Sequence, residues 1–177
     1  MIHKPSFFVF TGGPGVGKTT LIHHLQTLGE RVVEETARAV IREQVEAGGS
    51  GVPWIDPRLF GDLTAARDIA IFDQMAGETE RVFFDRGIMD SCGGNGVVPS
   101  AAILEAVRTR RYNTRVFLFP PWREIYETDT ERRQEWAEAE RTFDLILKRL
   151  PTLGYDPVVV PKADVVTRAA FILARAL

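Results

Sequence analysis

The feature that most constrains this chain is a glycine-rich loop at 12–19. It reads Gly-Gly-Pro-Gly-Val-Gly-Lys-Thr, the phosphate-binding loop (P-loop) pattern in which spaced glycines are followed by lysine and threonine. A β-rich run at 6–11 leads into the loop, and apolar residues at helical spacing follow it from Leu21 to Leu28. Because a strand, a glycine loop and a helix in this order form a phosphate site, the sequence predicts nucleotide binding here.

Each part of this loop has an expected role. Glycines let successive backbone N–H groups curl around phosphate oxygens, and the helix that follows adds the positive end of its dipole. Lys18 is expected to contact the β- and γ-phosphates, and the Thr19 hydroxyl is expected to ligate Mg²⁺. The predicted nucleotide-binding residues are Gly12, Gly13, Pro14, Gly15, Val16, Gly17, Lys18, Thr19 and Thr20.

Length, charge and cysteine content restrict the class of protein. A chain of 177 residues is expected to form one nucleotide-binding domain over 1–177. The formal net charge of −2 argues against a nucleic-acid partner, and no apolar run approaches the roughly 20 residues of a membrane span. Cys92 is the only cysteine and no secretory signal pattern is evident, so we expect a cytoplasmic protein. The oligomeric state is left open.

Five short β-rich runs alternate with segments of helical periodicity. The runs are 6–11, 31–34, 81–85, 115–119 and 158–160. They are nearly continuous in apolar residues, which is typical of strands buried on both faces of a parallel sheet. We therefore predict an α/β fold of three layers, in which a five-stranded parallel sheet lies between helices.

Capping residues predict where the helices begin and end. Gly29 is expected just after the helix that follows the P-loop, and Asp56 and Ser100 are expected to cap two later helices. Thr128 and Glu131 have the spacing of a capping box before a long amphipathic helix.

The run that ends in Asp85 predicts the second half of a metal site. A P-loop needs a carboxylate from a neighbouring strand to hold Mg²⁺, and Asp85 follows an apolar strand. Asp90 is a weaker alternative for metal or substrate. Arg86 is expected either to contact a phosphate or substrate or to be an ordinary solvated arginine.

Glu35 and Arg38 follow the second predicted strand and are candidates for the acceptor side. Ligands of open α/β sheets bind at the carboxyl ends of strands, so both residues should face the P-loop crevice. Glu35 could accept a proton from a substrate hydroxyl, and Arg38 could clamp a phosphate or carboxylate. The alternative is a helix start in which Arg38 is merely the i+3 partner of Glu35 in the first turn. Glu34 is expected to end the strand.

Arg132 and Arg133 fall where a helix start disfavours cations. In phosphoryl transfer an arginine over the nucleotide stabilises charge on the γ-phosphate, and Arg132 is the preferred candidate. The alternative is a solvated face paired with nearby glutamates.

Four segments together resemble a known group. They are 12–20, 34–38, 84–87 and 130–133. The chain resembles small P-loop proteins often labelled AAA-type ATPases, which are similar to the ribosylnicotinamide kinase domain of NadR proteins and to nucleoside and nucleotide kinases. The resemblance implies a sheet order of 2-3-1-4-5 and a mobile arginine lid near 124–135.

The same resemblance implies a bound Mg-nucleotide and a small-molecule acceptor near Glu35 and Arg38. The Asp85-Arg86 pair stands where a motor has Asp-Glu, which favours transfer to a bound acceptor over hydrolysis. We therefore predict a kinase that uses ATP and Mg²⁺, with catalytic roles for Lys18, Glu35, Asp85 and Arg132. The alternative is a non-catalytic ATP- or GTP-binding switch, or an ATPase, that engages a protein or membrane partner.

The base preference depends on a motif after the fifth predicted strand. Lys162-Ala163-Asp164 has the Lys-x-Asp spacing used for guanine in GTP-binding proteins, but Pro161 stands where that motif has Asn or Thr. The sequence therefore favours adenine, with GTP as the alternative.

Overall fold

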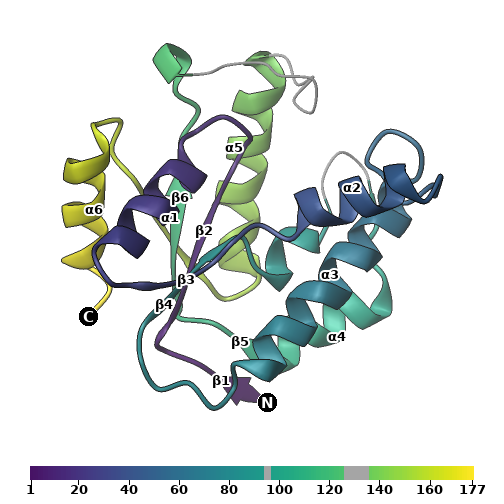
Figure 1. Cartoon of the computed structure of the whole chain (residues 1–177), viewed down its shortest axis with the longest axis horizontal. Helices are drawn as coiled ribbons and strands as arrows, with labels where there is room; N and C mark the ends of the chain where they lie inside the picture. Colours follow the sequence, from purple (N-terminus) through teal and green to yellow (C-terminus); the bar gives the residue numbers. More distant parts are fainter. Residues whose placement is uncertain (94–96, 126–135) are drawn as a thin grey trace.

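A five-stranded parallel sheet forms the centre of the computed structural model, which describes residues 1–93, 97–125 and 136–177. Its strands, from one edge to the other, are β3 (Arg31–Val33), β4 (Val82–Asp85), β2 (Phe7–Gly12), β6 (Arg115–Phe119) and β7 (Asp156–Val159) (Figure 1). Every neighbouring pair in it is parallel. Counted among these strands alone in chain order, the arrangement is 2-3-1-4-5, as expected.

Two further strands form a small separate sheet that the sequence did not indicate. They are β1 (Ile2–His3) and β5 (Arg110–Arg111), which pair in parallel. Each is only two residues long, so neither carries enough alternation to be seen in the sequence.

The helices connect the strands. They are α1 (Lys18–Thr27), α2 (Ala37–Glu46), α3 (Pro57–Gln74), α4 (Ala101–Thr109), α5 (Trp136–Thr152) and α6 (Val165–Leu173), with 3₁₀ turns η1 (Ile88–Ser91) and η2 (Arg123–Ile125). Two of the expected caps are confirmed, since Asp56 accepts a hydrogen bond from Leu59 N at 2.9 Å and Ser100 accepts one from Ile103 N at 3.4 Å. The capping box expected at Thr128 and Glu131 lies outside the described residues. Among the described helices, none is long and apolar enough to cross a bilayer.

Alternation along β2 builds the two apolar layers. Phe7 and Val9 point to one face of the sheet, where they pack with Phe72 of α3, and Phe8 and Phe10 point to the other face. In Figure 1, α1 and α6 lie on one side of the sheet and α3 and α4 on the other. The predicted three-layer α/β arrangement is therefore confirmed.

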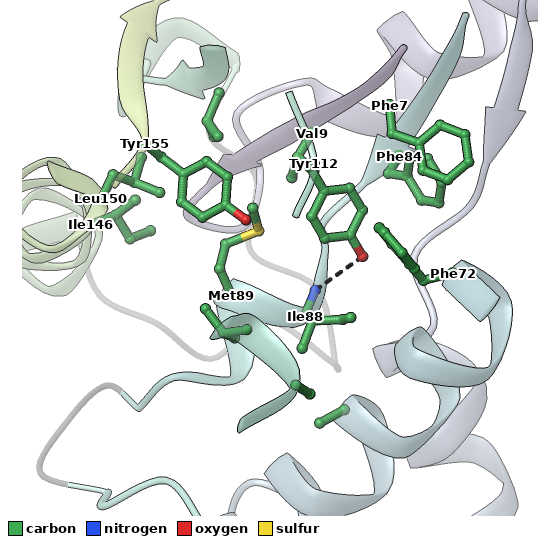
Figure 2. Close-up of a cluster of buried hydrophobic side chains, with 14 of the residues drawn as sticks. Phe7, Val9, Phe72, Phe84, Ile88, Met89, Tyr112, Ile146, Leu150 and Tyr155 are labelled. Atoms are coloured by element: carbon green, nitrogen blue, oxygen red, sulfur yellow. Dashed lines mark hydrogen bonds between the residues drawn. The ribbon is translucent and has the colours of Figure 1, made fainter. Parts of the chain in front are cut away.

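A buried tyrosine fixes the turn that follows β4. The ring of Tyr112 packs edge-on against Phe72 and Phe84, with centroids 5.0 and 5.4 Å apart, and its hydroxyl accepts a hydrogen bond from Ile88 N at 3.4 Å (Figure 2). Gly87 approaches this ring so closely that an added Cβ would lie 3.1 Å from a ring carbon. The core thereby holds the end of β4 and the start of η1 in one position beside the P-loop.

Candidate active site

The P-loop joins the central strand β2 to α1. Gly17 precedes α1 with φ of 80°, a left-handed conformation that favours glycine, and no side chain caps the helix start. Gly12 lies against β6, where a Cβ would come within 2.6 Å of the Phe119 carbonyl oxygen. The first N–H groups of α1 are thus available to an anion, and the helix dipole favours negative charge there.

Lys18 is the cation at the centre of this loop. Its side chain is buried, and Nζ donates hydrogen bonds to the carbonyl oxygens of Gly13 at 2.8 Å and Gly12 at 3.3 Å. Burial, with the nearby charge of Arg86, lowers the Lys18 pKa to about 8. The ammonium remains mostly protonated at neutral pH and has no carboxylate within salt-bridge distance in the described part of the chain.

Thr19 and Asp85 come together as the sequence suggested. The Thr19 hydroxyl donates to Asp85 Oδ2 at 3.0 Å, while Asp85 Oδ1 is buried with no hydrogen-bond partner in the described structure. Burial raises the Asp85 pKa, against the opposing effect of Lys18. A hydroxyl oxygen and a buried carboxylate oxygen that has no hydrogen-bond partner are ligands that suit Mg²⁺. Within the described ranges, no cluster of three or more His, Cys, Asp or Glu side chains offers an alternative metal site.

Asp85→Asn should therefore affect metal dependence more than folding. The substitution keeps the side-chain shape and removes a buried charge, so we expect a melting temperature near that of the wild type without ligand. The additional stabilisation that Mg²⁺ gives in the presence of ATP should be reduced. Thermal melting with ATP alone and with Mg-ATP measures both quantities, and equal Mg²⁺ dependence in the two proteins would exclude a metal role for Asp85.

Glu35, Arg86 and Asp90 form a charged network next to the P-loop. Arg86 Nε donates to Glu35 Oε1 at 2.7 Å, and its Nη1 lies 3.5 Å from Asp90 Oδ1. Burial alone would raise the Glu35 pKa, but the charges of Arg86 and Lys18 outweigh it and lower the pKa to about 2. Arg86 has φ of 72°, unusual for a residue with a side chain, and such strain is common at functional sites. Arg86 is therefore not a freely solvated arginine.

Both carboxylate oxygens of Asp90 accept hydrogen bonds from nearby residues. The Thr11 hydroxyl donates to Asp90 Oδ1, and Gly87 N donates to Oδ2 at 3.0 Å. These bonds, with the ion pair to Arg86, make Asp90 a positioning group for the β4–η1 turn.

Arg38 pairs with Glu35 at the i,i+3 spacing that the sequence suggested. The alternative placed both residues in the first turn of a helix, but α2 begins at Ala37 and Glu35 lies before Thr36, the residue that precedes the helix. Arg38 Nε still lies 3.4 Å from Glu35 Oε2, and its side chain is 44% exposed. Arg38 therefore reaches both Glu35 and solvent.

A cleft of about 1070 Å³ connects these groups. Its lining includes the loop at 14–20 and, from the expected acceptor side, Glu35, Arg38 and Arg86. The side chains of Arg132 and Arg133, and most of the expected lid near 124–135, lie outside the described residues; only Glu124 and Ile125 of that segment are described, and both line the cleft.

Asp68 of α3 is a cleft residue that the sequence reasoning missed. It is 8% exposed, and its Oδ1 accepts a hydrogen bond from the Thr36 hydroxyl at 2.6 Å. Burial raises the Asp68 pKa to about 7, although the Thr36 bond opposes this shift. The sequence did contain a signal for its burial, because Asp68 lies at helical spacing from Ala65 and Phe72 and so on the apolar face of its helix.

The raised pKa of Asp68 predicts a pH-dependent stability. Because its folded-state pKa exceeds the ordinary value of 3.8, its stabilising contribution is complete below that value and is lost as pH rises through about 7. The melting temperature of Asp68→Asn, relative to that of the wild type, should therefore rise as the pH is raised from 4 to 7. The lowered pKa of Glu35 has the opposite effect, because the stability that its ionised form contributes is lost as pH falls from 4.5 toward 2. The pH range in which Glu35 affects stability is therefore largely separate from the range for Asp68. Melting curves across this range, with exposed Asp144→Asn as control, measure the effect; parallel curves would contradict it.

The sheet order and the P-loop after its central strand define a P-loop NTPase fold. A family model described as an AAA domain matches residues 7–168, and the chain belongs to that family. A search of curated proteins found no match.

Several solved kinases share the fold. Deoxyadenosine kinase from M. mycoides, with products dCMP and a flexible dCDP bound, has a TM-score of 0.67 at 12% identity, covering 96% of this chain and 97% of that one. Thymidylate kinase from Ehrlichia chaffeensis has a TM-score of 0.64 at 16% identity, covering 97% and 98%. Shikimate kinase from Acinetobacter baumannii in complex with shikimate has a TM-score of 0.56 at 17% identity, covering 97% and 92%. At these identities the likeness shows the fold.

Proposed function

We propose that residues 1–177 form one nucleotide-binding domain that transfers a phosphoryl group from Mg-ATP to a small-molecule acceptor. The observation that carries this proposal is that one cleft is lined by the P-loop lysine, by Thr19 and by the Glu35–Arg86 ion pair, and that Asp85 accepts a hydrogen bond from Thr19 at 3.0 Å. The shared fold of small-molecule kinases supports the same reaction class.

On the nucleotide side, the free N–H groups at the start of α1 and the Lys18 ammonium bind the phosphates. The ammonium exchanges its hydrogen bonds to the Gly12 and Gly13 carbonyls for phosphate oxygens. Thr19 and Asp85 would hold Mg²⁺, which supplies neutralisation of phosphate charge when bound.

On the acceptor side, Glu35 is ionised at neutral pH because its pKa is lowered to about 2. Arg86 fixes one carboxylate oxygen at 2.7 Å, and Arg38 approaches the other at 3.4 Å. A carboxylate oriented in this way accepts a hydrogen bond from the acceptor hydroxyl and aligns it for attack; this alignment is the role we propose for Glu35. Arg86 also brings positive charge to the side of the cleft where phosphate charge develops.

The alternative remains a nucleotide-binding switch or an ATPase that acts on a partner. It differs from a kinase in one measurable respect, since a kinase releases ADP faster when its acceptor is present. The cleft favours a kinase because it extends from the P-loop to residues of α2 and α3, where an acceptor could lie beside Glu35.

A two-stage screen tests the proposal. Thermal shift with ATP, GTP and their Mg²⁺ complexes identifies the donor, and nucleosides and vitamins are then added in the presence of the donor. We expect Mg-ATP to stabilise the protein and one acceptor class to stimulate ADP release. Stabilisation by Mg-ATP with no stimulation by any acceptor would favour the switch.

A further inference from the structure

Arg168 of α6 packs against the back of the P-loop. It is 5% exposed, and its Nη1 donates to the carbonyl oxygens of Val16 at 3.4 Å and Gly17 at 3.5 Å. A Cβ added at Gly17 would lie only 2.7 Å from the same nitrogen. The guanidinium is thus anchored to the loop itself.

The same guanidinium holds an aromatic side chain at the cleft wall. Its central carbon lies 5.4 Å from the centroid of the Trp122 ring, within cation–π range. Trp122 follows the end of β6, is partly exposed and lines the cleft together with Arg168 and the loop at 14–20. An aromatic face is therefore held at a fixed distance from the phosphate site.

The order of the strands determines which part of a bound ligand lies near Trp122. Along the sheet edge, Glu35 follows β3, Asp85 ends β4, the P-loop follows the central β2, and Trp122 follows β6. Because the proposed acceptor takes the β3 and β4 side of the phosphates, the β6 and β7 side is the one left for the nucleoside part of the donor.

The carboxylate of the Lys-x-Asp motif, which could have bound a base edge on this side, is used to cap α6. Asp164 caps α6, with Oδ1 accepting from Thr167 N at 2.9 Å and Oδ2 accepting from the Thr167 hydroxyl at 2.8 Å. Lys162 is exposed and does not line the cleft. The Asp164 carboxylate therefore serves the start of α6.

We propose that Trp122, held by Arg168, binds the nucleotide base by its face, so that adenine and guanine nucleotides bind with similar affinity. This inference rests on the proposed nucleotide site and concerns donor choice alone. Stacking on an aromatic side chain tolerates any base because every base has a π-face.

Binding of Mg-ATP, Mg-GTP and Mg-tripolyphosphate to the full chain tests the inference by calorimetry. Tripolyphosphate carries the phosphates without a base. Trp122→Ala should weaken both nucleotides about tenfold and leave tripolyphosphate unchanged, whereas Trp122→Phe should retain most of the affinity. Trp54→Ala, which removes an indole that is 60% exposed, is the matched control.

Three results would overturn the inference. The first is that Trp122→Ala weakens tripolyphosphate binding as much as nucleotide binding, and the second is that it leaves nucleotide affinity unchanged. The third is that the wild type prefers one purine nucleotide by more than about a hundredfold, a discrimination that stacking does not supply. Failure of the wild type to bind any of the three ligands would instead refute the proposed function and, with it, this inference. Wild-type nucleotide binding that Trp122→Ala leaves unchanged would refute the inference alone.

Discussion

Lys18→Ala is expected to abolish measurable turnover and to weaken Mg-ATP binding by roughly 10- to 100-fold, the range for losing charge-assisted hydrogen bonds to phosphate. The unliganded fold should not suffer. Lys18 is buried with a pKa lowered to about 8, which means that the fold disfavours its charge, and its described hydrogen bonds are to the Gly12 and Gly13 carbonyls. Calorimetry with Mg-ATP and melting without ligand measure the two effects.

The control for this variant is Lys162→Ala, which removes an exposed lysine outside the cleft lining. Unchanged Mg-ATP affinity together with unchanged turnover in Lys18→Ala would exclude the P-loop from the reaction. Loss of binding accompanied by a large drop in the unliganded melting temperature would point to a role for Lys18 in the fold instead.

Glu35→Gln should lower phosphoryl transfer by about 10²–10⁴-fold while Mg-ATP affinity stays near that of the wild type. The amide retains the shape of the side chain but loses the charge that orients an acceptor hydroxyl. Once the screen has supplied an acceptor, single-turnover transfer and nucleotide titration measure the two quantities. Glu34→Gln is a matched control, because Glu34 is the adjacent glutamate and its side chain is 70% exposed.

Removing the Glu35 charge also leaves Arg86 with a weaker set of partners, so the fold must be checked. Glu35→Asp keeps the charge near Arg86 and shortens the reach toward the acceptor; it should melt like the wild type and still lose transfer. If nucleotide affinity collapses in Glu35→Gln while residual transfer stays high, Glu35 belongs to the nucleotide site or to the fold.

The sequence was most informative where function depends on a continuous segment. The P-loop, the strand pattern and the caps at Asp56 and Ser100 are local, because glycine conformations, strand alternation and capping bonds involve neighbouring residues. The convergence of Glu35 and Asp85 could also be anticipated, since carboxyl ends of parallel strands share one edge of the sheet.

The tertiary contacts of Asp68, Trp122 and Arg168 could not be predicted from the sequence, although the helical spacing of Asp68 placed it on the apolar face of α3. Asp68 becomes a cleft residue because α3 packs beside α2 and brings it to the Thr36 hydroxyl. Arg168 reaches the P-loop from the last helix of the chain, and this contact depends on the packing of α6 against α1. No periodicity or motif encodes either contact.

The sequence by itself determined the layered α/β architecture and the phosphate loop, because both follow from patterns of apolar and glycine residues along short stretches of chain. The tertiary structure decided the chemical state of the site. Arg86 is placed between Glu35 and Asp90, and that juxtaposition keeps Glu35 ionised. Burial raises the pKa of Asp68 to about 7, against the opposing effect of the hydrogen bond from Thr36. Charge interactions and desolvation depend on distance and burial in space, and residues far apart in the chain acquire both only when the sheet and helices have packed.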